Sequence, residues 1–587
     1  MRCHSRRPGW LLLLGLGPVA AALFALAGCG ANPPPPLGVQ PPTPEPAAFE
    51  DVTATSGVAF TYRNGEDAGH FAIIESLGGG VALFDYDGDG RLDIFLPGGG
   101  AYDGKTVIGH PCKLYRNLGA CKFEDVTAKV GLDEVNFQYS HGAAAFDYDR
   151  DGQLDLLVSG YNRLALLRNE SDGKGGRRFV DVTKKAGLND GLWSTSAAWG
   201  DLNGDGYPEV YVAHYGDWGF GTNHPPDCTY DGKTRDVCQP RRFQPLPHTL
   251  YKNNGDGTFT DISAAMKLRK DGRGIGVAFV DLDNDGRPDI YSVNDTDDNF
   301  LYANRGQRGK IALEEMGLLA GVARDDRGVA NGSMGIGVAD FNRVGRASLF
   351  VTNYENELPA LYSNLTDKGN MRFVFDTLRT GAGAIGGNYV SWGTGFFDHD
   401  LDGWEDVAIV SGHAIRFPVK LDRRQKPVLL RNDRGKFRAA VTGDWPYFKD
   451  SHNARGLAIG DLDNDGKPDL VVSHLNEPVV VLRNVAPTAG RHWVGFRLLR
   501  AKAADAIGAR IAIETAGGKQ TRYAFSGGSY GSTHDPRLHF GLGTDAKISK
   551  VTVYWPSGKV QEVAGVEPDA YWEIAEDANE PKRVGGK

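Results

Sequence analysis

The sequence predicts an all-β fold, and three observations lead to that prediction. Short apolar runs rich in β-branched and aromatic residues recur along the chain, each bounded by Gly or Asn. An acidic nonapeptide precedes each run, as in Asp461-Leu-Asp-Asn-Asp-Gly-Lys-Pro-Asp469. A second motif, Leu-Tyr-x-Asn or a close variant, follows each run, as in Leu114-Tyr-Arg-Asn117. Because this set recurs about every 63 residues, the sequence predicts a series of four-stranded units.

The first residues carry an export signature. Three arginines precede an apolar run that ends in Leu26-Ala-Gly-Cys29, which resembles a bacterial lipobox. We therefore interpret residues 1–28 as a signal peptide and Cys29 as a lipidated residue, with an ordinary cleaved signal or a short membrane anchor as the alternative. The Pro-rich residues 29–48 predict a stiff tether. The expected location is the cell envelope or outer membrane, facing the periplasm or the exterior, with the lipid as the only membrane contact.

The acidic nonapeptides predict metal sites. Positions 1, 3, 5 and 9 offer side-chain oxygens around a Gly at position 6, a pattern that suits Ca2+ and its six to eight oxygen ligands. An EF-hand is excluded because position 12 is never a Glu. The predicted ligands are Asp85, Asp87, Asp89 and Asp93; Asp147, Asp149, Asp151 and Asp155; Asp201, Asn203, Asp205 and Glu209; Asp281, Asp283, Asp285 and Asp289; Asp398, Asp400, Asp402 and Asp406; and Asp461, Asp463, Asp465 and Asp469.

One further copy of the loop, residues 340–348, is the fifth of seven in chain order; it has Val344 and Ser348 at positions 5 and 9 and is expected to bind no ion. The cofactor prediction is thus about six Ca2+. The six complete loops hold 23 carboxylates, so six bound ions would change the formal charge of −9 to about +3. We therefore interpret the acidity as mostly a set of metal ligands, and nothing in the sequence indicates a nucleic-acid partner.

Two partial units predict how the series closes. Residues Phe49-Glu-Asp-Val-Thr53 match the outer strand of other units, such as Phe123-Glu-Asp-Val-Thr127, but have no acidic loop before them. The seventh unit has a loop but lacks that outer strand. We infer that residues 49–53 complete the seventh unit and close a seven-bladed β-propeller over residues 49–487, which leaves no open sheet edge. Residues 490–576 alternate as strands broken by Gly and Pro and predict a small β-sandwich, followed by a polar tail, 577–587.

On these motifs the chain resembles known families. The acidic loop followed by Leu-Tyr-x-Asn resembles the FG-GAP/VCBS repeats of integrin α-subunits and bacterial envelope proteins, which implies a seven-bladed β-propeller with calcium in the turns of one rim. Ala506-Ile-Gly-Ala-Arg510, Gly527-Gly-Ser-Tyr530 and Val553-Tyr-Trp-Pro-Ser-Gly558 look like the ASPIC/UnbV domain. That domain follows such a propeller in the cartilage acidic protein family.

The loops after each second strand should open on the rim opposite the acidic loops, where loops on a rigid ring form the default ligand surface. The residues predicted for this ligand face are Tyr161, His214, Trp218, Asn294, Asn353, His413 and His474. In an exported protein the local pairs Cys112/Cys121 and Cys228/Cys238 predict two disulfides, although four cysteines permit three pairings and zinc stays open.

No catalytic motif is assigned, and the sequence has no His-Glu-x-x-His. We therefore assign no catalytic residue. The leading hypothesis is a calcium-stabilised extracytoplasmic recognition or adhesion protein that binds carbohydrate or protein at the cell envelope. One alternative is a secreted or envelope-bound enzyme that acts on polysaccharide or uses a redox cofactor. The other is a structural protein of envelope assembly.

Overall fold

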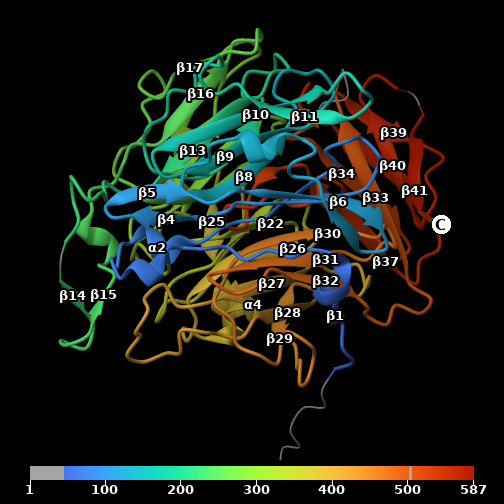
Figure 1. Cartoon of the computed structure of the whole chain (residues 1–587). Coiled ribbons are helices and arrows are strands. Elements are labelled where there is room, and N and C mark those ends of the chain that lie inside the picture. The colour runs from blue at the N-terminus through green and yellow to red at the C-terminus, as the bar shows by residue number, and fades with distance from the viewer. Residues whose placement is uncertain (1–44, 226, 501–504, 579, 587) are drawn as a thin grey trace, which may run out of the picture. The chain divides into compact units, whose positions relative to one another are not determined.

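The computed structural model describes residues 45–225, 227–500, 505–578 and 580–586 (Figure 1). The predicted signal peptide, Cys29 and nearly all of the tether lie outside these residues. Strands dominate the described part, and its helices are short turns of three or four residues. None of those helices has the length and apolar character needed to cross a membrane. The prediction of an all-β fold is confirmed.

Seven antiparallel sheets of four strands follow one another along residues 49–484. The first three, innermost strand first, are β2 (Ala82–Phe84), β3 (Asp93–Leu96), β6 (Lys113–Gly119) and β7 (Lys122–Asp125); β8 (Ser140–Phe146), β9 (Asp155–Gly160), β10 (Arg163–Ser171) and β11 (Arg177–Asp181); and β12 (Ser194–Gly200), β13 (Glu209–His214), β16 (Thr249–Asn253) and β17 (Phe259–Asp261).

The next three sheets repeat the order. They are β18 (Gly274–Val280), β19 (Asp289–Asn294), β20 (Phe300–Asn304) and β21 (Leu313–Glu315); β22 (Ile336–Ala339), β23 (Ser348–Val351), β24 (Ala360–Asn364) and β25 (Phe373–Phe375); and β26 (Ser391–Phe397), β27 (Asp406–Ser411), β28 (Val428–Asp433) and β29 (Lys436–Ala439). The seventh sheet is β30 (Ala454–Gly460), β31 (Asp469–His474), β32 (Val480–Asn484) and β1 (Phe49–Asp51).

Hairpins and short helices fill the connections. The hairpins are β4 (Gly100–Asp103) with β5 (Thr106–Gly109), and β14 (Cys228–Thr229) with β15 (Arg235–Asp236). The helices are α1 (Thr53–Ser56), η1 (Glu66–Ala68), α2 (Ile74–Leu77), η2 (Leu132–Glu134), η3 (Pro240–Arg242), α3 (Gly317–Ala320), α4 (Thr377–Thr380) and η4 (Ala382–Ile385).

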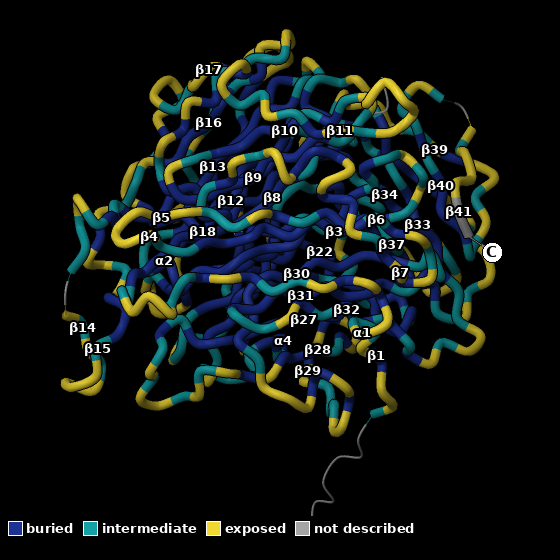
Figure 2. The backbone as a smooth tube through the Cα atoms, viewed as in Figure 1, coloured by how far each residue is buried: buried dark blue, intermediate teal, exposed yellow. Residues whose placement is uncertain are grey.

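The seven sheets form a closed ring. Their innermost strands contact one another in the order β2, β8, β12, β18, β22, β26 and β30, and β30 in turn contacts β2. The last sheet is completed by β1, where Phe49 pairs with Asn484 and Asp51 with Leu482, as the sequence predicts. Neighbouring sheets share a core, so that Phe84 and Phe95 of the first pack with Leu156 and Val158 of the second. The second strand of a sheet is buried along its length, as β9 is in Figure 2, which explains why its sequence reads as a largely apolar run.

The Asn of each Leu-Tyr-x-Asn motif links one sheet to the next. Its side-chain amide donates to the main-chain carbonyl at position 2 of the acidic loop in the preceding sheet, at 2.8 or 2.9 Å. The seven donor and acceptor pairs are Asn117 and Leu462, Asn169 and Tyr86, Asn253 and Tyr148, Asn304 and Leu202, Asn364 and Leu282, Asn432 and Phe341, and Asn484 and His399. The repeated Asn therefore connects each pair of neighbouring sheets around the ring through a hydrogen bond.

We expect Asn304→Ala to lower the thermal midpoint of unfolding. The substitution removes three buried hydrogen bonds, two donated to the carbonyls of Leu202 and Pro288 and one accepted from the N–H of Gly306, which should cost about 2–4 kcal/mol. The matched control is Asn189→Ala at an exposed position. Its free energy of unfolding should stay within about 0.5 kcal/mol of that of the native protein. Thermal unfolding is monitored by circular dichroism. Equal midpoints for the two variants would contradict a stabilising role for this hydrogen bond between sheets.

Residues 492–586 form two further sheets. One has the order β37 (Leu538–Gly543), β33 (His492–Leu499), β40 (Ala570–Ala575) and β41 (Lys582–Gly586). The other is β35 (Gly518–Tyr523), β34 (Arg510–Thr515), β38 (Lys550–Tyr554) and β39 (Val560–Val563). One apolar cluster joins both sheets and includes Phe496 and Phe540 from the first and Ile511 and Val553 from the second. These residues are the C-terminal domain below.

The C-terminal domain inserts one segment into the centre of the ring. This segment, residues 526–535, includes β36 (Ser526–Gly527), which pairs with β18. Its atoms bond to the innermost strand of every sheet. From the first sheet to the seventh, the partners are Leu83, Ala143, Trp199, Phe279, Ile336, Thr394 and Ile459. We call residues 526–535 the plug.

Candidate functional site

Each acidic nonapeptide forms the turn between the first and second strands of its sheet, and the backbone orients its carboxylates. In the seventh loop the two oxygens of Asp461 accept the amide N–H groups of Asp465 and Gly466 at 3.1 and 2.7 Å. The last carboxylate, Asp469, accepts the N–H groups of Leu462 and Asn484 at 2.9 and 2.7 Å. The Gly at position 6 has a positive φ in all seven loops, 91° at Gly466, which other residues rarely adopt.

The carboxylates of a loop converge. Candidate ligand atoms lie within 4.8 Å of one another in four such groups, which are Asp85, Asp87 and Asp93; Asp147, Asp149 and Asp155; Asp281, Asp283 and Asp285; and Asp398, Asp400 and Asp402. Two oxygens that each lie 2.3–2.6 Å from one Ca2+ can be at most about 5 Å apart, so this spacing fits a single ion.

Position 3 gives the clearest test of fit. The Oδ1 atoms of Asp87, Asp283, Asp400 and Asp463 are buried and have no hydrogen-bond partner. A buried oxygen without a donor costs free energy, and a cation at the centre of the loop would remove that cost. The residues present therefore fit a hard divalent cation.

The other oxygen of the aspartate at position 3 pairs with an arginine. This arginine directly precedes the Asn of the Leu-Tyr-x-Asn motif or directly follows it. The ion pairs are Arg116 with Asp87, Arg168 with Asp149, Arg305 with Asp283, Arg431 with Asp400 and Arg483 with Asp463. Sequence analysis assigned no role to these arginines. The pairing orients each aspartate, and in all of them except Asp149 the second oxygen is left without a partner.

Electrostatics also favours a bound cation. Burial raises the pKa of Asp147 and that of Asp402 to about 6, and repulsion from neighbouring carboxylates adds to both shifts. Without a cation, a fraction of these groups would be protonated near neutral pH. A divalent ion in the loop would supply the charge that keeps them ionised.

Two loops depart from the pattern. In the third, Glu209 replaces the final aspartate, and its Oε2 accepts the N–H of Leu202 at 2.8 Å, so the longer side chain keeps the same role. In the loop of residues 340–348, Ser348 Oγ accepts the N–H of Asn364 at 3.1 Å, as a carboxylate does elsewhere. Ser348 therefore preserves the turn without a negative charge.

The C-terminal domain lies against the loop rim. Tyr571 donates to Asp461 Oδ2 at 2.6 Å, and Arg537 donates to the main-chain oxygen of Asp461 at 2.9 Å. His539 Nε2 is 2.7 Å from the main-chain oxygen of Gly466, and Arg500 pairs with Asp201. Residues of the acidic loops and of the C-terminal domain thus share one interface.

The residues predicted for the ligand face are buried. Tyr161 is 9% exposed, and His214, Trp218, Asn294, Asn353, His413 and His474 are all at or below 3%. His214, for example, lies between Asp190 and the main-chain oxygen of Pro247, at 2.8 and 2.7 Å. The prediction that these side chains form an exposed surface is therefore wrong. The connections between strands cover these side chains, which form contacts inside the rim instead of facing solvent.

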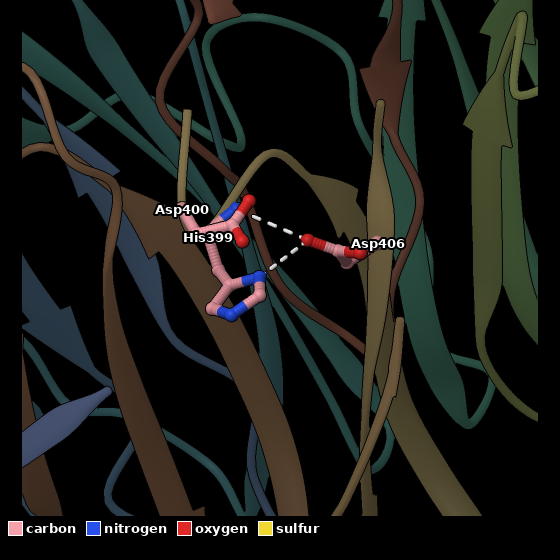
Figure 3. Close-up of side chains that lie close together, drawn as sticks. All are labelled: His399, Asp400 and Asp406. Carbon is pink, nitrogen blue, oxygen red and sulfur yellow. Dashed lines mark hydrogen bonds and ion pairs between the residues drawn. The ribbon is translucent and has the colours of Figure 1, made fainter. Parts of the chain in front are cut away.

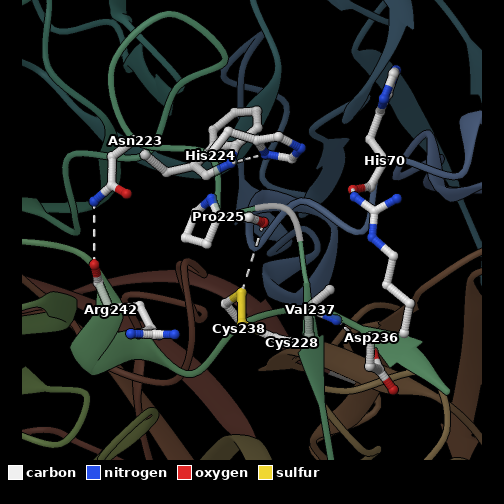
Figure 4. The surroundings of a disulfide bond; sticks show 11 residues. His70, Asn223, His224, Pro225, Cys228, Asp236, Val237, Cys238 and Arg242 are labelled. Carbon is white, nitrogen blue, oxygen red and sulfur yellow. Dashed lines mark hydrogen bonds between the residues drawn. A yellow bond between two sulfur atoms is a disulfide. The ribbon is translucent and has the colours of Figure 1, made fainter. Parts of the chain in front are cut away.

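One of the two predicted disulfides is confirmed. Cys228 and Cys238 are bonded and connect the hairpin β14–β15 to the residues that follow it (Figure 4). Cys112 and Cys121 are free and buried, so that prediction is wrong. The reason is that β6 lies between them, and a seven-residue strand places its two ends about 20 Å apart.

The closed ring and its repeated acidic turns define a β-propeller protein. Residues 85–158, 147–212, 247–292 and 398–472 match the model of the FG-GAP-like repeat, and residues 500–581 match ASPIC and UnbV. The chain therefore contains FG-GAP-like repeats followed by a C-terminal ASPIC/UnbV domain. This combination indicates an extracellular protein of adhesion or recognition type.

Cartilage acidic protein 1 shares this architecture. The chain is 24% identical to the protein from Xenopus tropicalis over 504 residues, which is 82% of this chain and 70% of that one. It is also 24% identical to the human protein, over 84% of this chain and 71% of the relative. A looser structural likeness, with a TM-score of 0.36 and 17% identity, covers 68% of this chain and 85% of an Agrocybe aegerita lectin.

Proposed function

We propose that this chain is an extracytoplasmic recognition or adhesion protein whose ring is stabilised by about six calcium ions. The observation that supports calcium is the buried, unpartnered oxygen at position 3 of four loops. Each ion would replace repulsion among carboxylates with coordination and would tie the first two strands of a sheet together. Anchoring through Cys29 belongs to the same proposal.

We propose that the ligand, a carbohydrate or a protein, binds to the rim opposite the acidic loops. The C-terminal domain lies on the acidic rim, which leaves the opposite one available. The connection between β27 and β28 lies there and presents Phe417 and Val419, which are 52% and 62% exposed. Asp236 accepts the N–H groups of Arg416 and Phe417 at 3.0 and 2.7 Å, and this holds the connection in place. Exposed aromatic residues on rigid loops are typical centres of binding energy.

The full chain, expressed with its leader and probed on glycan and protein arrays in calcium, tests this function. We expect Phe417→Ser combined with Val419→Ser to weaken capture at least tenfold, which corresponds to about 1.4 kcal/mol. The matched control is Leu319→Ser, which removes an apolar side chain that is 79% exposed on α3. Unchanged capture by the double variant would refute the proposed surface, and turnover of an arrayed polysaccharide would favour an enzyme. Recovery of a Cys29→Ser variant in the membrane fraction would refute the lipid anchor.

A further inference from the structure

The sixth acidic loop differs from the other complete loops at position 2. That position holds Tyr86, Tyr148, Leu202, Leu282 and Leu462 in the other five, and none of these side chains offers a strong metal ligand at neutral pH. In the sixth loop it holds His399. An imidazole nitrogen is therefore added to a set of four aspartates in this loop alone.

The ring of His399 points toward the last carboxylate of its loop (Figure 3). His399 Nδ1 is 2.5 Å from Asp406 Oδ2, and the main-chain N–H of His399 donates to the same oxygen at 3.3 Å. Candidate ligand atoms of His399, Asp400 and Asp406 all lie within 4.8 Å of one another. A second group, Asp398, Asp400 and Asp402, has the same spacing. The two groups share Asp400, so His399 lies beside the aspartate cluster of its own loop.

A separate observation points to an ion at this position. Asp400 Oδ1 is buried and has no partner, although Oδ2 of the same carboxylate pairs with Arg431 and with Arg491. The side chain of Asp400 is only 10% exposed. Two arginines thus orient this carboxylate, and its remaining oxygen is available to a ligand inside the loop.

The donor set decides which ion the loop prefers. Ca2+ takes oxygen ligands, whereas imidazole nitrogen suits first-row transition ions such as Co2+, Ni2+ and Zn2+. We propose that the sixth loop is a mixed nitrogen and oxygen site that prefers a divalent first-row transition ion to Ca2+, with His399 as the deciding ligand. The inference rests on the proposed metal binding by the repeated loops. In calcium alone, the four aspartates still bind Ca2+ as in the other loops.

Cobalt binding in excess calcium tests the proposal on the full chain after its metal has been removed. We expect the native protein to retain one Co2+ and five Ca2+. His399→Leu introduces the residue found at position 2 of three other complete loops, and we expect six Ca2+ and a Co2+ affinity at least tenfold lower. The matched control is His492→Leu, since His492 Nδ1 is 2.7 Å from Asp569 Oδ2 outside the loops. That variant should bind Co2+ as the native protein does.

Equal Co2+ affinity of the native chain and His399→Leu would overturn the proposal. Absence of bound calcium from every loop would instead overturn the proposed function, so the two failures are distinguishable by the calcium count. X-ray absorption at the cobalt edge of the native protein gives a readout that does not depend on folding of the variant. Scattering from an imidazole ring supports the proposal, and a shell of oxygen atoms alone would refute it.

Discussion

Gly527→Val should destabilise the whole described chain. Gly527 lies in the plug with a φ of +78°, and a Cβ atom there would clash with the main-chain oxygen of Val277 on β18. A left-handed conformation costs a β-branched residue at least about 1–2 kcal/mol, and displacement of the plug would add the loss of its buried bonds. We expect the free energy of unfolding to fall by more than about 4 kcal/mol, the range reached when a buried hydrogen-bond network is broken.

The readouts for Gly527→Val are the thermal midpoint and limited proteolysis between the seventh sheet and β33, where cleavage should become fast. The matched control is Gly565→Val, because Gly565 has a φ of +77° and a Cβ atom added there would meet no other atom within 4 Å. The control isolates the cost of the backbone conformation. If the two variants have the same thermal midpoint and are cleaved by the protease at the same rate, the plug does not stabilise the ring.

Removal of calcium should produce the second large effect. A ligand at 100 times its Kd stabilises the folded state by about 2.7 kcal/mol per site, so six independent loops would contribute about 16 kcal/mol. We expect native mass spectrometry in calcium alone to count about six ions, and chelation to lower the thermal midpoint strongly. If the protein binds no calcium, or if its thermal midpoint is the same with and without the chelator, the assignment of the acidic loops as calcium sites is wrong.

The loop of residues 340–348 offers a gain-of-function control for calcium. Val344→Asp combined with Ser348→Asp restores positions 5 and 9, and the new carboxylate at 348 can accept the N–H of Asn364 as Ser348 Oγ does. We expect this double variant to bind one more ion than the native protein. An unchanged count would show that ligand identity alone does not determine which loops bind.

Much of the ring was predictable because its determinants are local. The spacing of aspartates around a Gly fixes each turn, and the resemblance of residues 49–53 to an outer strand indicated which sheet they complete. The plug was not predictable, because Gly527-Gly-Ser-Tyr530 has neither an apolar period nor a strand pattern, and its partners come from seven distant strands. Its density of glycines was the available signal, since Gly permits close backbone approach.

The site predictions failed where burial depends on contacts distant in sequence. Position after a second strand correctly places His214 or His474 at a rim, but it does not reveal which connections fold over that rim. The arginines that pair with position 3 were visible in the motifs, yet their role needs the register of two strands. The error at Cys112 and Cys121 arose because proximity in sequence was taken for proximity in space.

The pairing of β1 with β32 constrains how this molecule is made. Thr53 Oγ1 accepts the N–H of Val481, and these residues are 428 positions apart. During synthesis from the N-terminus, the first strand has no partner until nearly the last propeller residue has emerged. Such non-local topologies fold slowly and leave edges exposed to aggregation meanwhile. Until β32 has been synthesised, β1 therefore remains an unpaired edge strand.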